Sequence, residues 1–253
     1  MQHRDRAAAH QHAAMTIHVS DDYAQRQERY DASRRFLRDV LLRPLGFHLL
    51  VKINEQGIEN IPAAGPTLLM MNHIGAIDPA IIAGVARPRF AIPMSKAENF
   101  RILGVRQLAQ WWGVFPIQRG EADRVALQNT IDLLKYGNMV LMAPEGTRQP
   151  SLIEGKDGIT YVAIKANAVI VPVGLDGSRD FVQNLKHLRR TPVSVKFGRA
   201  FRFRTNGQER VPRPVMAHMT QEAMYQLAAL LPEYRRGFYS DLSQATTETI
   251  EFV

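Results

Sequence analysis

The sequence predicts an α/β protein in which a central, mostly parallel sheet is flanked by helices. Apolar runs that are too short for helices alternate along the chain with segments of helical periodicity, which is the pattern of strand–helix–strand units. With 253 residues, of which 45% are hydrophobic, the chain is long enough to bury one substantial core. We therefore expect a single α/β domain.

The expected strands and helices follow one another in a regular order. Residues 68–71 form the clearest buried strand, bounded by Gly65 and Pro66, and Pro79 suits the first turn of a helix over 79–85. Pro172 is costly inside a sheet, so we expect its strand at an edge or Pro172 at a strand end. The other strands are expected at residues 89–94, 114–117, 139–143, 169–173, 193–197 and 201–203, and the other helices at 100–112, 121–136, 159–166 and 214–231.

Four segments are predicted along the chain. They are a mobile N-terminal tail (1–21), an amphipathic helical segment (22–55), the α/β domain (56–232) and a loosely held polar tail (233–253). Residues 36–51 are too short and too charged to span a bilayer, which needs about 20 apolar residues. They either lie in a membrane interface or pack on the core of the domain itself, and Pro44 and Gly46 are expected to break or kink their helix.

Charge and composition restrict the partners and the chemistry. The formal net charge is +8 and the isoelectric point is about 10.0, which indicates an anionic partner: phosphates, an anionic lipid surface or nucleic acid. Without cysteine, the chain has no disulfide, no thiolate metal ligand and no cysteine acyl-enzyme. The N-terminus lacks the apolar core of a signal peptide, so we expect a cytosolic protein.

His73 and Asp78 follow the first buried strand, on a short loop that leads into a helix. Ligands of open α/β sheets gather at such strand ends. An offset of five residues points two side chains apart on a helix or a strand, so only a turn brings these two together. Asp78 would then fix the tautomer of His73 and leave the other ring nitrogen free as a general base. A surface histidine and an aspartate that merely caps the helix remain the alternative explanation.

Other polar side chains also follow expected strands, and they converge on one edge of the sheet if those strands are parallel. Three cations there would suit a reaction of an alcohol on a phosphate-bearing molecule, because arginine binds phosphate bidentately and lysine acts as a point charge. Gly146 allows close approach of the backbone, whose amides could stabilise an oxyanion. Alternatively, each cation is a solvated surface residue. The side chains in question are Asn72, Lys96, Arg119, Glu145, Thr147 and Arg148.

Four blocks of the sequence resemble those of the 1-acyl-glycerol-3-phosphate acyltransferases, in the same order. Asn72-His73 followed by Asp78 resembles the Asn-His-x4-Asp motif of that family. Residues 113–119 look like its second block, Pro-Glu-Gly-Thr-Arg at 144–148 like its third, and Val-Pro-Val at 171–173 like its fourth. The similarity to that family covers roughly residues 56 to 200. The chain departs from the family pattern at Gly75 and Gln149, where serine is frequent, at Ala143, where an aromatic residue is frequent, and after Lys96, where the usual Glu-Leu is missing.

This resemblance implies the reaction and the role of each residue. His73, assisted by Asp78, would remove the proton from the free hydroxyl of 1-acyl-glycerol-3-phosphate, and the product would be phosphatidic acid. Acyl-CoA or acyl-carrier protein would donate the acyl group as co-substrate, with no metal and no other cofactor. Lys96, Arg119 and Arg148 would hold the phosphate of the acceptor, while Asn72, Glu145, Gly146 and Thr147 would shape the site.

A lysophospholipid acceptor also gives residues 36–51 a purpose, which is to dock the site on an anionic membrane surface. The sequence thus predicts a peripheral protein on the cytoplasmic face of a membrane, with its amphipathic helical segment as the docking element.

Three alternatives stay open. Acyl transfer to another acceptor, such as glycerol-3-phosphate, another lysophospholipid, or a lipid-linked amine or sugar, keeps the same chemistry. A lipid hydrolase of the common serine type is disfavoured because the Gly-x-Ser-x-Gly motif is absent. Residues 181–213 carry nine Lys or Arg and one acid, Glu209, which would also suit a nucleic-acid-binding module, although we expect no nucleic-acid partner.

Overall fold

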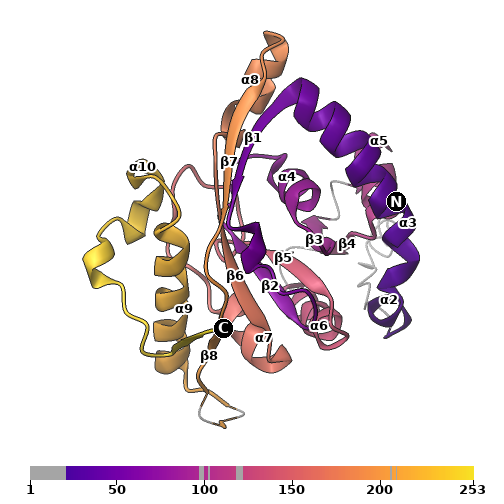
Figure 1. Cartoon of the computed structure of the whole chain (residues 1–253). Helices are drawn as coiled ribbons and strands as arrows, with labels where there is room; N and C mark the ends of the chain where they lie inside the picture. Colours follow the sequence, from indigo (N-terminus) through magenta and orange to yellow (C-terminus); the bar gives the residue numbers. More distant parts are fainter. Residues whose placement is uncertain (1–20, 97–99, 102, 118–121, 206, 209) are drawn as a thin grey trace, which may run out of the picture.

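One sheet of nine strands runs through the part of the chain that the structure describes (Figure 1). The computed structural model describes residues 21–96, 100–101, 103–117, 122–205, 207–208 and 210–253, so the predicted tail of residues 1–21 lies almost wholly outside the described residues. The strands are β1 (Val51–Gln56), β2 (Thr67–Met71), β3 (Ala91–Lys96), β4 (Phe115–Ile117), β5 (Met139–Met142), β6 (Val169–Asp176), β7 (Thr191–Phe197), β8 (Phe201–Phe203) and β9 (Ile250–Phe252).

The sheet is mostly parallel, as the sequence predicts. The strand order is β1-β7-β6-β2-β5-β3-β4, with β8 paired to β6 and β9 paired to β8. β2 runs parallel to β5 and β6, and β3 runs parallel to β4 and β5, whereas β7 is antiparallel to β6. The ends of β2, β3, β4, β5 and β6 therefore meet at one edge of the sheet, which we call the C-terminal edge.

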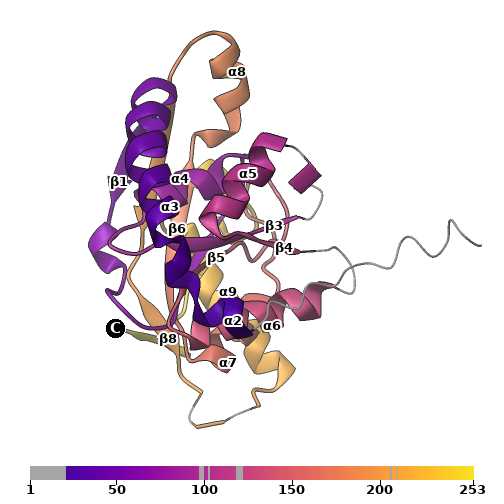
Figure 2. The same ribbon diagram turned by 90° about the vertical axis from the view of Figure 1, so that its right-hand side faces the viewer.

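Helices cover both faces of the sheet (Figures 1 and 2). α6, α7 and α9 cover one face, while α4 covers the other, with η2 and α5 packed against it. The main helices are α2 (Asp21–Gln25), α3 (Asp31–Phe36), η2 (Leu37–Leu50), α4 (Asp78–Val85), α5 (Leu103–Trp112), α6 (Ala122–Lys135), α7 (Gly158–Ala166), α8 (Phe181–Lys186), α9 (Arg213–Ala228) and α10 (Glu233–Arg236). Short helical turns are η1 (Gln27–Tyr30), η3 (Ile58–Asn60), η5 (Ser178–Asp180), η6 (Gly237–Tyr239) and η7 (Leu242–Gln244).

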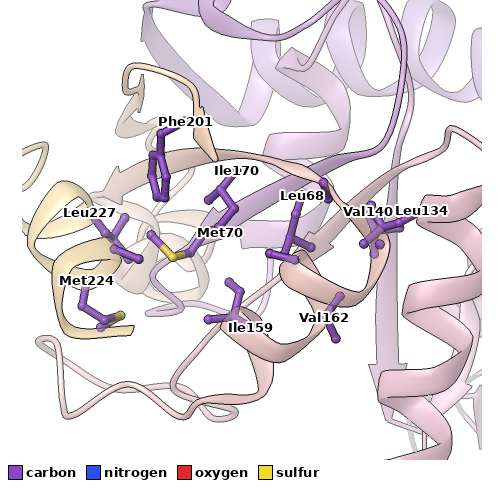
Figure 3. Packing of buried hydrophobic residues seen from close by; sticks show 14 of the residues in the cluster. Leu68, Met70, Leu134, Val140, Ile159, Val162, Ile170, Phe201, Met224 and Leu227 are labelled. Atoms are coloured by element: carbon purple, nitrogen blue, oxygen red, sulfur yellow. The ribbon is translucent and has the colours of Figure 1, made fainter. Parts of the chain in front are cut away.

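β2 contributes to the core on both faces of the sheet, because successive side chains of a strand point in opposite directions. Leu68 and Met70 lie in the cluster beneath α6, α7 and α9 (Figure 3), whereas Leu69 and Met71 lie in the cluster beneath α4. All four side chains are almost completely buried. β2 is thus held from both sides, and its packing fixes where the loop after Met71 begins.

Pro172 lies in the interior of the sheet, which corrects the prediction of an edge strand or a strand end. β6 pairs with β2 on one side, and on its other side it pairs with β8 at Ile170 and with β7 from Val173 onward. The carbonyl of Pro172 accepts a hydrogen bond from the N–H of Gly198 (2.8 Å), so the nitrogen of Pro172 faces that side too. The missing N–H therefore falls where the partner changes from β8 to β7, and the ladder does not require it there.

The predicted N-terminal helical segment is present, with two corrections. Residues 51–55 are not helical but belong to β1, because they pair in parallel with β7. The helix also does not break at Pro44 and Gly46; it continues to Leu50 within η2, whose turns are of the wider π type. Wider turns relieve the clash between a proline ring and the preceding turn of an α-helix.

One face of this N-terminal segment packs on the domain and the other faces outward. Arg34 is buried, and its Nε donates a hydrogen bond to the carbonyl of Trp112 (2.7 Å). Leu37 is buried against α4 and α5, whereas Phe36 and Val40 are each 48% exposed. Packing on the core is therefore confirmed for one face only. Within the described part of the chain, no helix is long and apolar enough to cross a membrane.

The C-terminal residues are folded, which corrects the prediction that residues 233–253 are loosely held. Tyr239 is 2% exposed, and its ring packs edge-on against Tyr225 of α9 with 5.1 Å between the ring centroids. β9 pairs with β8, and the carboxylate of Glu222 accepts the backbone N–H groups of Glu248 and Thr249. The polar composition of residues 233–253 did not indicate an ordered segment, because hydrogen bonds to α9 and a few aromatic side chains hold it to the domain.

Candidate active site

The loop between β2 and α4 carries His73 and Asp78 at the C-terminal edge. Nδ1 of His73 lies 2.9 Å from Oδ2 of Asp78. The side chain of Asp78 is fully buried, and that of His73 is 21% exposed. The same Oδ2 accepts the backbone N–H groups of Ile74 and Gly75, each at 2.7 Å. The prediction that a turn brings His73 and Asp78 together is confirmed.

The hydrogen bonds around Asp78 fix the tautomer of His73. A carboxylate oxygen only accepts hydrogen bonds, so Nδ1 of His73 must carry the proton that it shares with Oδ2. In the neutral ring, Nε2 then has no proton and is free to accept one. Because His73 is partly exposed and Asp78 is not, only the imidazole can reach a molecule at this edge.

Asp78 does not cap the helix, which corrects the capping role that the sequence suggested. It is the first residue of α4, and the position before it is Ile77, without any capping side-chain hydrogen bond. The carboxylate turns back to the loop instead, and its Oδ1 accepts a hydrogen bond from the hydroxyl of Ser178. Two loop amides, an imidazole and a hydroxyl thus occupy the lone pairs that capping would need.

Asn72 fixes the start of the loop against β6. Its Nδ2 donates to the carbonyl of Leu175 and its Oδ1 accepts the N–H of Leu175, both at 2.8 Å. The side chain is 2% exposed, so these two bonds extend the pairing of β2 and β6 beyond Met71. Asn72 therefore shapes the site from inside the fold.

Glu145 supports His73 from the loop that follows β5. Its Oε2 accepts the N–H of His73 (3.3 Å), and its Oε1 accepts the N–H of Ile153 (3.2 Å). Burial raises the pKa of the Glu145 carboxyl to about 7, although both backbone hydrogen bonds oppose the shift. The N–H of Gln149 also donates to the carbonyl of His73 (2.8 Å). The loop after β5 thus holds the backbone of His73 at two points.

Gly146 occupies a tight turn in the same loop, with Thr147 half-buried beside it. Its φ of 69° is left-handed, and a Cβ there would lie 3.2 Å from Nζ of Lys156. The N–H of Gly146 donates to the carbonyl of Ala143 (3.1 Å). The turn therefore uses the N–H of Gly146 itself, and stabilisation of an oxyanion by backbone amides of this loop stays a prediction.

Of the three predicted phosphate-binding cations, the structure describes the side chain of Arg148 alone. Arg148 is exposed and directly precedes Gln149, whose backbone N–H donates to the carbonyl of His73. Arg148 therefore lies at the same edge of the sheet as His73. The backbone of Lys96 ends β3 at the C-terminal edge, but its side chain and all of Arg119 lie outside the described residues. Among the side chains that are described, no group of three His, Asp or Glu could hold a metal ion, and the absence of a metal stays a prediction.

Sequence reasoning missed two residues of the site, Ser178 and Lys156. Ser178 follows β6, and a polar residue just after a strand is the signal that singled out the other site residues. The expected strand ended at residue 173, whereas β6 continues to Asp176, so the signal was overlooked. Lys156 belongs to no sequence block, and only the turn at Gly146 brings its ammonium group near the site.

Most of the site lies in a segment that matches a known protein family. The family model named Acyltransferase matches residues 52–176, from β1 to the end of β6, and this range contains all four sequence blocks. The chain belongs to the acyltransferase family. The resemblance drawn from the four blocks is thereby confirmed.

Curated relatives of this acyltransferase-family chain bear one name, 1-acyl-sn-glycerol-3-phosphate acyltransferase. The chloroplastic protein of Arabidopsis thaliana is 31% identical over 132 residues, which cover 50% of this chain and 36% of the relative. The protein of Borreliella burgdorferi is 30% identical over 52% of this chain and 54% of its own length. That of Bacillus subtilis is 29% identical over 47% and 60%. The chain thus spans about half the length of the curated relatives it matches.

A solved structure shares the fold of this acyltransferase-family chain. The crystal structure of the 1-acyl-sn-glycerophosphate acyltransferase PlsC from Thermotoga maritima aligns with a TM-score of 0.55 and 19% identity, covering 87% of this chain and 81% of that chain. The predicted fold class, a mostly parallel sheet flanked by helices, is confirmed.

Proposed function

We propose that the chain is an O-acyltransferase that moves a fatty acyl group to the free hydroxyl of 1-acyl-glycerol-3-phosphate and so produces phosphatidic acid. The observation that carries this proposal is the hydrogen bond between His73 Nδ1 and the buried carboxylate of Asp78. The names of the curated relatives and a family match that includes His73, Asp78 and Glu145 support it.

His73 acts as the general base in this proposal. Nε2 accepts the proton of the acceptor hydroxyl while the hydroxyl oxygen attacks the carbonyl carbon of an acyl thioester. The Asp78 carboxylate stabilises the imidazolium ion that forms. The carbon–sulfur bond then breaks, and the leaving thiolate takes the proton from His73. The donor is acyl-CoA or acyl-carrier protein, and the cysteine-free chain agrees with direct attack.

The phosphate of the acceptor binds to cations around His73. Arg148 can grip it bidentately, and Lys156, whose Nζ lies close to Gly146, adds a point charge. Lys96, the last residue of β3, and Arg119, which follows β4 in the sequence, complete the proposed set. This arrangement would hold the glycerol hydroxyl against Nε2 of His73.

We further propose that the protein works on the cytoplasmic face of an anionic membrane, bound through the outward face of α3 and η2. Phe36, Val40, Leu45 and Leu49 on that face are 48–62% exposed. Replacing Phe36 and Val40 by serine is expected to lower co-sedimentation with anionic vesicles, and wild-type binding by this variant would exclude the docking face. Deleting residues 1–51 is a poorer test, because it removes the buried Arg34 and Leu37.

The proposed activity is tested by incubating purified protein with acyl-CoA and a panel of acceptors. Released CoA is the only thiol that a colorimetric reagent meets, since the protein has no cysteine. Thiol release with lysophosphatidic acid, together with formation of phosphatidic acid, is expected. Faster release with glycerol-3-phosphate, another lysophospholipid or a lipid-linked amine or sugar would reassign the acceptor. No release with any acceptor, from acyl-CoA or acyl-carrier protein, would overturn the proposal.

A further inference from the structure

α8 lies at the C-terminal edge, between β6 and β7 (Figure 1). It begins three residues after Ser178, whose hydroxyl binds Asp78. Phe181 packs on the core beneath α4, and Nδ2 of Asn184 donates a hydrogen bond to Oγ1 of Thr191 (3.2 Å). These contacts hold one side of α8 against the domain and leave its other side facing outward.

Three apolar side chains of α8 and the turn after it are exposed. Val182 is 58% exposed, Leu185 is 42% exposed and Leu188 is 94% exposed. Val182 and Leu185 share a helix face because they are three residues apart. Leu188 has a φ of 52°, the left-handed conformation that closes the end of α8, because the N–H groups of Leu188 and Arg189 donate to the carbonyls of Leu185 (3.1 Å) and Asn184 (2.9 Å). This turn accounts for the backbone but not for a leucine side chain that projects into water, and three exposed apolar side chains side by side indicate a contact outside the chain.

Cations stand beside these apolar side chains. Lys186 and Arg189 are exposed, and residues 181–199 include five Lys or Arg and no Asp or Glu. Such a segment complements an anionic surface, whose headgroups attract the cations while the leucines enter the acyl boundary. We call Val182, Leu185, Lys186, Leu188 and Arg189 the α8 tip.

The α8 tip is tied to the end of η2. Nη2 of Arg190 donates hydrogen bonds to the carbonyls of Phe47 (3.0 Å) and Val51 (3.1 Å), and Val51 pairs with Thr191 at the start of β1 and β7. α8 and the end of the N-terminal helix therefore lie at the same end of the molecule (Figures 1 and 2). Since β7 is antiparallel to β6, this is also the C-terminal edge, where His73 lies.

We propose that the α8 tip is a second lipid-contact element that rests on an anionic bilayer together with the exposed end of η2. Two contacts at one end of the molecule fix its orientation, whereas the single N-terminal helix leaves it free to rotate about the helix axis. This orientation turns the C-terminal edge toward the bilayer, where a lipid acceptor would reside. Only the placement of the acceptor near His73 rests on the proposed function. The contact between the α8 tip and the bilayer does not, because it is measured without turnover.

The first experiment measures binding to vesicles of phosphatidylglycerol and phosphatidylcholine by flotation. The triple variant V182S/L185S/L188S is expected to lower the partition coefficient roughly tenfold or more, since three apolar side chains lose their burial in the interface. The matched control is Y136S/V215S/V253S, which alters exposed apolar residues after α6, in α9 and after β9, away from the C-terminal edge, and it is expected to bind as the wild type. Unchanged binding by the α8 triple variant, with the same thermal unfolding as the wild type, would overturn the proposal.

The second experiment labels the α8 tip directly. Because the chain has no cysteine, L188C accepts a single environment-sensitive fluorophore, and Y136C places the same label before β5, at the opposite edge of the sheet, as the control. Vesicles are expected to shift the emission of the label at position 188 to the blue and to leave the label at position 136 unchanged. If the label at position 188 stays in water on vesicle-bound protein, the bilayer contact is contradicted. If its emission shifts with protein concentration in the absence of lipid, the contact is also contradicted, and the surface is assigned to a second copy of the chain.

The two proposals fail in different ways. If the protein is inactive but its label at position 188 enters vesicles, the lipid contact is supported and the acyltransferase function is overturned. If the protein is active but its label stays in water, the lipid contact alone is overturned. The V182S/L185S/L188S variant should also keep wild-type thiol release with a detergent-dispersed acceptor, because none of the three residues belongs to the site.

Discussion

Ser178 donates a hydrogen bond to Oδ1 of Asp78, the carboxylate oxygen that does not contact His73. Gly75 leaves room for it, since a Cβ on Gly75 would lie 2.9 Å from Oγ of Ser178 and 3.0 Å from Oδ1 of Asp78. The hydroxyl beside Asp78 therefore comes from Ser178 at the start of η5, while position 75, where serine is frequent in the family, carries no side chain. Asp78 is thus oriented by two segments that are 100 residues apart.

Replacing Ser178 by alanine should lower kcat roughly tenfold, because a hydrogen bond to a buried carboxylate is lost and Asp78 orients His73 less well. The KM for the acceptor should stay close to the wild-type value, since Ser178 is buried behind Asp78 and does not reach a substrate. Steady-state kinetics by thiol release measure both constants. The exposed Ser240→Ala is the control, and a wild-type kcat for Ser178→Ala would remove Ser178 from the site.

Replacing Gly75 by alanine should damage both folding and turnover. The added methyl group would lie 2.9 Å from Oγ and 3.0 Å from the carbonyl oxygen of Ser178, so one of the two segments must shift. Overpacking of this kind costs about 1–3 kcal/mol, which urea unfolding detects. Gly104 has open space around it, and Gly104→Ala should leave the free energy of unfolding unchanged or raise it. Equal stability of Gly75→Ala and the wild type would contradict the packing described here.

Glu145 should make the stability of the protein depend on pH. Its pKa rises from 4.5 to about 7 on folding, so between these values the folded chain keeps a proton that the unfolded chain has lost. Stability therefore falls as pH rises through this range, by up to ~3 kcal/mol. The free energy of unfolding of the wild type, minus that of Glu145→Gln, should decrease by this amount from pH 4.5 to 7 and then level off, because only the wild type loses stability in this range. Parallel pH curves for the two proteins would refute the prediction, and the exposed Glu59→Gln should follow the wild type.

Replacing Arg148 by alanine should weaken acceptor binding and leave the chemical step intact. The KM for lysophosphatidic acid is expected to rise roughly tenfold with little change in kcat, because a charge-assisted hydrogen bond to phosphate is lost. The effect should vanish with monoacylglycerol, an acceptor without phosphate. Arg204→Ala, which alters an exposed arginine just after β8 at the opposite edge of the sheet, is the control. An equal loss with both acceptors would argue against a phosphate contact.

The sequence could predict the parallel sheet and the pair at its edge, because both depend on local signals. An apolar run with a turn behind it indicates β2, and the offset between His73 and Asp78 allows only a turn. The interior position of Pro172 could not be predicted, because it depends on β7 and β8 sharing one side of β6. The folded C-terminus depends likewise on Glu222 and Tyr225 of α9, which are distant in the chain.

Within the site, the contact between Ser178 and Asp78 and the buried state of Glu145 could not be predicted from the sequence. Ser178 meets Asp78 only after β6 has paired with β2, and no motif joins the two residues. Burial raises the pKa of Glu145, and this burial requires the loops after β2 and β5 to close on each other. Signals carried by one segment can thus be read from the chain, whereas contacts between segments cannot.

The central claim is that His73 takes the proton of the acceptor hydroxyl, and His73→Ala tests it most directly. With acyl-CoA and lysophosphatidic acid, this variant should release thiol about 10²–10⁴-fold more slowly than the wild type, which is the usual contribution of a general base. Acceptor binding and thermal unfolding should be largely retained, and His218→Ala on α9 should keep full activity. Thiol release at the wild-type rate by His73→Ala would contradict the mechanism.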